Sequence, residues 1–109
     1  MKLIGLQLFR CATSVAANYR SACLARSPKE FSAKAGVLRE EADEALFWLT
    51  FVSRSGMASG VRQEVGALTD EAGQLARIFG AAYRTSKRRL GSDRPKTGAR
   101  GNPRTPINQ

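Results

Sequence analysis

Four carboxylates crowd into residues 40–44, and they are the densest group of side chains that could bind a metal or move a proton. They are Glu40, Glu41, Asp43 and Glu44. Di-iron sites in helical bundles combine paired glutamates with Glu-x-x-His motifs, and this chain contains no histidine. A magnesium or calcium site built from carboxylates would need a supporting loop, which the sequence lacks. We therefore expect no metal or cofactor, and we expect these acids to face solvent or to pair with Arg10, Arg20, Arg39 or arginines of a neighbouring subunit.

The sequence supports nucleophilic catalysis no better than it supports a metal site. The hydroxyl groups of Thr13, Ser14 and Tyr19 have no evident base to activate them. Cys11 and Cys23 fall on one predicted helix, about 18 Å apart at a rise of ~1.5 Å per residue, which is too far for a disulfide. We expect both cysteines to be small buried apolar residues in a reducing compartment. The sequence predicts a protein that is not an enzyme.

Positive charge is concentrated in the C-terminal quarter. Residues 1–83 carry ten basic and eight acidic residues, whereas residues 84–109 carry eight basic residues and one acid, Asp93. The eight are Arg84, Lys87, Arg88, Arg89, Arg94, Lys96, Arg100 and Arg104. They could neutralise phosphates and release counterions. Since no aromatic residue stands among them, the sequence predicts phosphate contact without recognition of bases. Two plainer explanations stay open, because cations favour helix C-termini and basic tails aid solubility.

Three helices must position these groups. Apolar residues recur in steps of three and four over residues 2–25, 28–54 and 61–89, which is typical of amphipathic helices. Ser27 and Glu30 form a capping-box pattern around Pro28, which suits a first helical turn. Gly56 and Gly60 mark the second connection. Short connections between long helices predict an all-α, antiparallel, up-and-down bundle.

The domain is predicted to cover residues 1–90. Residues 91–109 hold three of the four prolines and few apolar side chains, so a disordered basic tail is expected there. No stretch approaches the ~18 apolar residues of a membrane span, and we expect a cytoplasmic protein.

The middle helix also carries apolar residues on the side away from its main stripe. They are Val37, Phe47, Trp48 and Phe51. Because a helix that is apolar all round must be buried all round, a fourth helix or another subunit should cover this side. We predict that these four residues form an oligomer interface.

Two further features concern helix packing. Gly66, Gly73 and Gly80 recur every seven residues, and they predict either close approach by another helix or compositional drift in solvent. Asn18 falls within the apolar stripe of the first helix. It is expected to be a structural polar residue with a hydrogen-bond partner, or else to be partly exposed near the helix end.

Three segments together resemble one known family. Residues 8–20 (LFRCATSVAANYR), 27–31 (SPKEF) and 40–49 (EEADEALFWL) match, in order and spacing, the pattern of small bacterial four-helix-bundle proteins. That family includes proteins encoded in intervening sequences of 23S ribosomal RNA genes and the accessory variability determinant of diversity-generating retroelements. The resemblance covers roughly residues 5–85.

The resemblance implies a homo-oligomeric ring, typically a pentamer, and nucleic-acid binding. For the retroelement members it also implies partnership with a reverse transcriptase. Members usually have another helix before the segment that matches Leu3, so we expect either a start upstream of Met1 or a three-helix variant whose groove another subunit covers. Our expectation is a non-catalytic, ring-forming adaptor that binds RNA or DNA through phosphates. The alternative is a protein-interaction module without nucleic-acid binding.

Overall fold

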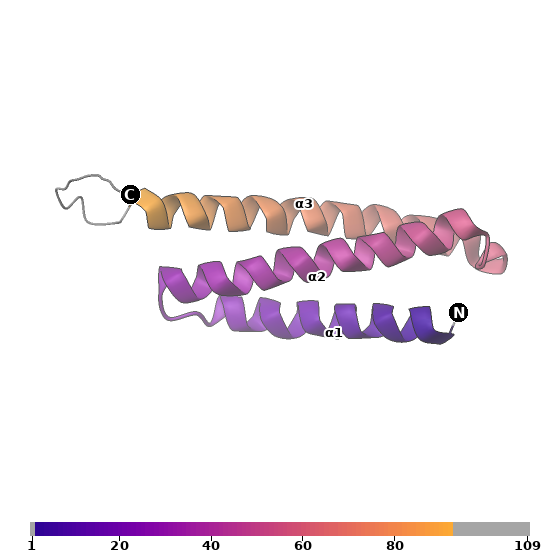
Figure 1. Ribbon diagram of the computed structural model, residues 1–109, viewed down its shortest axis with the longest axis horizontal. Coiled ribbons are helices and arrows are strands. Elements are labelled where there is room, and N and C mark those ends of the chain that lie inside the picture. Colours follow the sequence, from indigo (N-terminus) through magenta and orange to yellow (C-terminus); the bar gives the residue numbers. More distant parts are fainter. Residues whose placement is uncertain (1, 93–109) are drawn as a thin grey trace, which may run out of the picture.

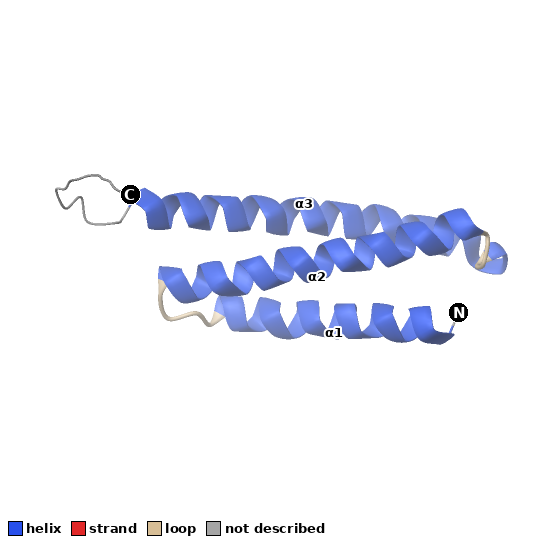
Figure 2. Ribbon diagram, viewed as in Figure 1, coloured by secondary structure: helices blue, strands red, loops and turns tan. Residues whose placement is uncertain are grey.

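The computed structural model describes residues 2–92, which form three long antiparallel helices (Figure 1). They are α1 (Lys2–Cys23), α2 (Pro28–Ser55) and α3 (Arg62–Ser92), with a short 3-10 turn η1 (Ser59–Val61) before α3. The described part of the chain contains no strand (Figure 2). The predicted all-α, antiparallel fold is confirmed.

The ends of α2 follow from local chemistry. The Ser27 hydroxyl accepts a hydrogen bond from the backbone N–H of Glu30 at 3.0 Å, and Pro28 occupies the first turn. The Glu30 carboxylate accepts from the N–H of Arg26 at 3.0 Å, one residue earlier than a standard capping box. At the other end Gly56 adopts a left-handed conformation with φ of 77°, which ends the helix at little steric cost.

Helix α2 is the central element. It packs against both α1 and α3, whereas no Cα atom of α1 lies within 8 Å of one in α3. The flanking helices meet through side chains, as at Tyr19 and Phe79, whose ring centroids are 6.4 Å apart. The main buried cluster is small. It comprises Ala22, Leu38, Ala42 and Phe79, with Val15 and Ala76 packed against it.

Helix α3 ends at Ser92, close to the predicted domain boundary at residue 90. The expectation that both cysteines are buried needs correction. Cys23 is exposed, and only Cys11 is buried as predicted. Cys23 stands in the last turn of α1 and borders an open cavity with Phe31 and Ala82, which leaves its side chain exposed. Arg94, Lys96, Arg100 and Arg104 lie outside the described residues.

The spaced glycines of α3 meet no other helix within residues 2–92. A Cβ atom at Gly66 would have nothing within 4 Å. At Gly73 and Gly80 it would meet only the guanidinium groups of Arg77 and Arg84, at 3.6 and 3.2 Å. The described helices include none that is both long and apolar enough to cross a membrane.

Candidate nucleic-acid interface

The antiparallel fold collects basic residues from three elements at one end of the molecule. The end of α1, the start of α2 and the end of α3 all lie together there (Figure 1). Residues 20–34 and 84–92 contain eight basic residues and one acidic residue, Glu30. The eight are Arg20, Arg26, Lys29, Lys34, Arg84, Lys87, Arg88 and Arg89. We call this set the basic end. The sequence pattern had identified only its α3 members.

The cations of the basic end are available to an outside partner. All are exposed except Lys34, which is half-buried. Within residues 2–92 none of them takes part in an ion pair. The single acid, Glu30, directs its carboxylate to the backbone of Arg26. The cations of this region are therefore not in ion pairs with the described acidic side chains, and Glu40 borders the same cavity as Lys29 and Lys87.

Direct contacts between α2 and α3 hold the basic end together. The hydroxyl groups of Ser32 and Ser86 are hydrogen-bonded at 3.0 Å, and both side chains are buried. One helical turn away, the ring of Tyr83 lies against Gly36, and the guanidinium carbon of Arg39 lies 5.1 Å from the centroid of that ring. These contacts fix the register of α2 against α3, so Lys29 and Lys87 come to border the same cavity.

Two cavities open beside the Ser32–Ser86 contact between α2 and α3, one on each side of it. The larger, of about 760 Å³, is bordered by Phe31 and Arg89, and Ser86 forms part of its wall. The smaller, of about 580 Å³, is bordered by Lys29, Tyr83 and Lys87. Aromatic rings thus lie among the cations. The basic run of α3 contains no aromatic residue in the sequence, because Phe31 belongs to another helix and Tyr83 directly precedes the run.

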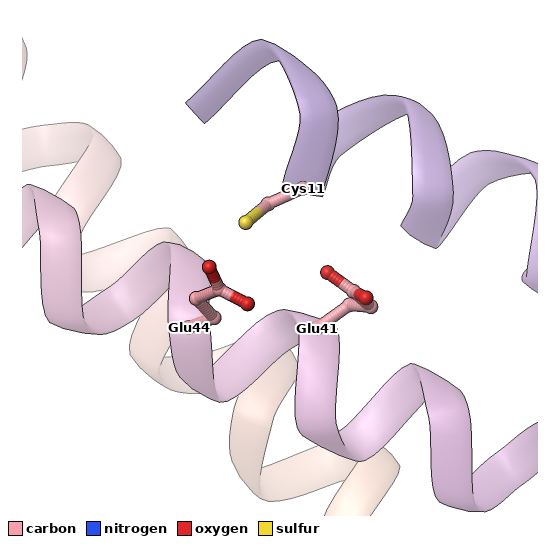
Figure 3. Close-up of side chains that lie close together, drawn as sticks. All are labelled: Cys11, Glu41 and Glu44. Atoms are coloured by element: carbon pink, nitrogen blue, oxygen red, sulfur yellow. The ribbon is translucent and has the colours of Figure 1, made fainter. Parts of the chain in front are cut away.

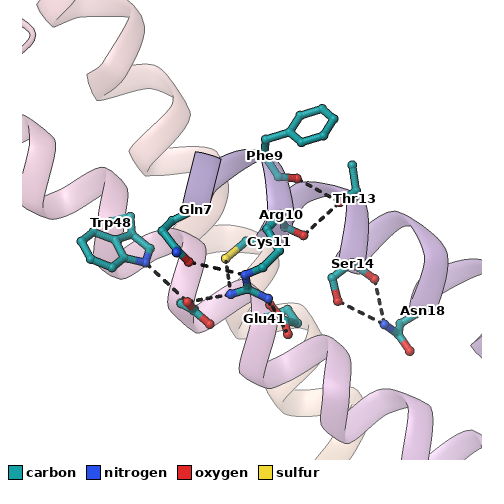
Figure 4. A network of polar contacts seen from close by, with 10 residues as sticks. Gln7, Phe9, Arg10, Cys11, Thr13, Ser14, Asn18, Glu41 and Trp48 are labelled. Carbon is teal, nitrogen blue, oxygen red and sulfur yellow. Dashed lines mark hydrogen bonds and ion pairs between the residues drawn. The ribbon is translucent and has the colours of Figure 1, made fainter. Parts of the chain in front are cut away.

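The acidic cluster lies elsewhere and is partly paired. The Sγ atom of Cys11 and carboxylate oxygens of Glu41 and Glu44 lie within 4.8 Å of one another, an arrangement that could in principle hold a metal (Figure 3). Arg10, however, approaches both carboxylates. It lies 3.3 Å from Glu41 (Figure 4) and 2.7 Å from Glu44. The expected pairing of these acids with Arg10 is confirmed, and Asp43 pairs with Arg39 at 3.9 Å.

Protonation also disfavours metal binding at this cluster. The hydrogen bond from Arg10 lowers the pKa of Glu44, so its carboxylate is charged but already paired. Burial raises the pKa of the Cys11 thiol, and the charge of Glu44 adds to that effect. A neutral thiol is a poor metal ligand. The group is better described as an ion-pair clamp between α1 and α2.

The four apolar residues predicted to form an interface do face away from the core. Phe47 is 58% exposed and Phe51 is 43% exposed, Val37 is exposed, and Trp48 is half-buried. The rings of Phe47, Trp48 and Phe51 contact one another, with centroids 5.1 to 6.5 Å apart. We call these three rings the aromatic patch. It is an apolar surface on the outer side of α2. Val37 lies ten residues earlier on α2 and borders a cavity with Lys29 and Tyr83, so it is not part of the patch.

Asn18 is half-buried and finds its partner within its own helix. Its side-chain amide donates to the backbone carbonyl of Ser14 at 2.9 Å and approaches the Ser14 hydroxyl at 3.3 Å (Figure 4). The expected partner therefore exists. It is local rather than on a facing helix, so this hydrogen bond does not fix the register between helices.

Comparison of the chain with models of known families, with curated proteins and with solved structures gives no match. The family resemblance drawn from residues 8–20, 27–31 and 40–49 accordingly remains a prediction.

Proposed function

We propose that this chain is a non-catalytic helical module that binds nucleic acid through phosphate contacts at the basic end. One observation supports the proposal above all. Three helix ends bring eight cationic side chains together, and within residues 2–92 none of them is paired with an acid. Lysine and arginine side chains that neutralise phosphates release condensed counterions, and this gain does not depend on base sequence. Binding should therefore be strong at low salt and weak at high salt.

Self-association through the aromatic patch is the second part of the proposal. Three mutually contacting rings on the outside of a helix form a larger apolar surface than isolated exposed residues do. Covering them with another subunit would bring several basic ends into one particle and raise the avidity for a long polyanion. The family resemblance extends the proposal to a pentameric ring and to a reverse transcriptase as partner.

The phosphate proposal is tested by fluorescence anisotropy with a labelled RNA over a series of salt concentrations. The double variant Arg84→Ala, Arg88→Ala removes two cations from the basic end. A matched control, Arg54→Ala, Arg62→Ala, removes two exposed arginines from the opposite end and leaves the same net charge. We expect weaker binding and a shallower salt dependence for the first variant only. Equal effects of both variants would mean that net charge alone drives binding.

The protein-interaction module remains the alternative, and the aromatic patch is the observation that favours it. Hydrophobic association does not weaken with salt as phosphate binding does. Light scattering after chromatography, with and without RNA, separates the two functions. An oligomer that does not bind RNA even at low salt would support the protein-interaction module and overturn the proposal of nucleic-acid binding.

A further inference from the structure

The larger cavity of the basic end combines features that the phosphate proposal does not use. It lies between the last turn of α1, the first turn of α2 and the end of α3, and its volume of about 760 Å³ is in the usual range for small-ligand sites. Small side chains such as Ala22, Cys23 and Ala82 form much of its wall. Polar groups are few, and they include Thr85 and Arg89. A flat, mainly apolar group with a negative charge attached would suit this lining.

Phe31 and Arg89 are the two side chains that give the cavity its chemistry. Phe31 belongs to the first turn of α2 and is 38% exposed, so part of its ring is open to an incoming group. Arg89 reaches the same cavity from α3, is exposed, and makes no ion pair with the described acids. Thr85 precedes it by four residues and therefore lies on the same helix face. An aromatic surface and an available guanidinium group thus border one cavity.

We propose that this cavity binds an unstacked base of a single-stranded nucleic acid, with the base against Phe31 and the adjoining phosphate at Arg89. The inference rests on the proposed function and narrows it from nucleic acid in general to single strands. Bases in a duplex are paired and stacked, so they cannot enter the cavity without being extruded. Stacking on an aromatic ring tolerates every base, which agrees with binding that is not sequence-specific.

The test uses anisotropy of the full chain with labelled oligouridine and with the duplex that it forms with oligoadenosine of equal length, both at low salt. Phe31→Leu keeps an apolar side chain but removes the aromatic face. We expect it to weaken binding of the single strand about tenfold and to change duplex binding little. Phe31→Tyr should restore binding. Phe9→Leu, which removes an exposed ring on α1 outside both the basic end and the aromatic patch, is the matched control and should have no such effect.

A second measurement needs no variant. Cys23 is exposed and forms part of the cavity wall, so a base in the cavity should slow its alkylation. Saturating oligouridine should slow the reaction and the duplex should not. An alkylation rate of Cys23 that oligouridine does not change would overturn the single-strand inference. So would a Phe31→Leu variant that weakens binding of the single strand and of the duplex equally. In either case the proposed function would still hold if binding depends on salt. If neither the single strand nor the duplex binds at low salt, the single-strand inference and the proposed function are both overturned.

Discussion

The ring of Tyr83 occupies the space where residue 36 would carry a side chain. A Cβ atom built on Gly36 would lie 3.0 Å from Cε1 of Tyr83 and 3.4 Å from its Cδ1. This separation is closer than ordinary van der Waals contact, so α2 and α3 can approach this closely only because residue 36 is glycine. The same ring lies beneath the guanidinium of Arg39, which limits its freedom to move away.

Gly36→Ala should therefore destabilise the protein. Forcing a methyl group into a packed site typically costs about 1–3 kcal/mol, and the better helix propensity of alanine offsets up to ~1 kcal/mol of that. We expect a lower midpoint in urea unfolding followed by circular dichroism. Gly66→Ala is the control, because a Cβ there meets nothing within 4 Å and the variant should be as stable as the parent or more so. A Gly36→Ala protein as stable as the control would contradict the close contact.

The ion-pair clamp predicts a pH dependence of stability. Arg10 lowers the pKa of Glu44 below its ordinary value of 4.5 in the folded state. The charged carboxylate therefore stabilises the fold above that value, and the contribution is lost as the pH falls through the lower, folded-state pKa. Glu44→Gln should lower stability at neutral pH, and its difference from the parent should shrink in acid.

Urea unfolding at several pH values measures this difference. Glu64→Gln is a suitable control, because within residues 2–92 Glu64 makes no ion pair. A constant difference between Glu44→Gln and the parent at all pH values would show that the carboxylate acts through packing rather than through charge.

The aromatic patch predicts that one charge should disrupt assembly. Trp48→Glu places a carboxylate among Phe47 and Phe51, where covering it with another subunit would require desolvating the charge. We expect a lower particle mass by light scattering, with unchanged helical content. Leu24→Glu makes a comparable change at an exposed apolar residue away from the patch and should leave the mass unchanged. If the Trp48→Glu variant keeps the particle mass of the parent, the aromatic patch is not the subunit interface.

The two cysteines should differ sharply in reactivity. Cys23 is exposed, whereas Cys11 is buried and its thiol pKa is raised. In the folded protein a thiol reagent should modify one cysteine quickly, and both should react in denaturant. Cys23→Ser should abolish the fast reaction, as counted by mass spectrometry. Rapid modification of Cys11 in that variant would mean that α1 separates readily from α2.

The local signals in the sequence were reliable. Ser27 and Pro28 predicted the start of α2 because a cap depends only on neighbouring residues, and Gly56 marked its end for the same reason. The helix faces followed from spacing, which placed Phe47 and Phe51 outside the core.

Features that depend on contacts between helices were harder to predict. Gly36 gave no periodic signal, whereas the regularly spaced Gly66, Gly73 and Gly80 suggested a contact that no helix within residues 2–92 makes. Cys23 follows Ala22, which is buried in the core, but its own side chain lies at the wall of an open cavity and is exposed. Phe31 joins the cations of α3 only through the antiparallel pairing of α2 and α3. The basic end was therefore visible from the sequence only in part.

The central position of α2 has a mechanical consequence. Because α1 and α3 are joined chiefly through α2, the removal of α1 would leave the α2–α3 pair and its Ser32–Ser86 hydrogen bond intact. The protein should therefore open in stages, with amide hydrogens of α1 exchanging before those along the α2–α3 seam. A ligand that contacts both α1 and α3 would link the two helices directly. The amide hydrogens of α1 should then exchange at a rate closer to that of the α2–α3 contact.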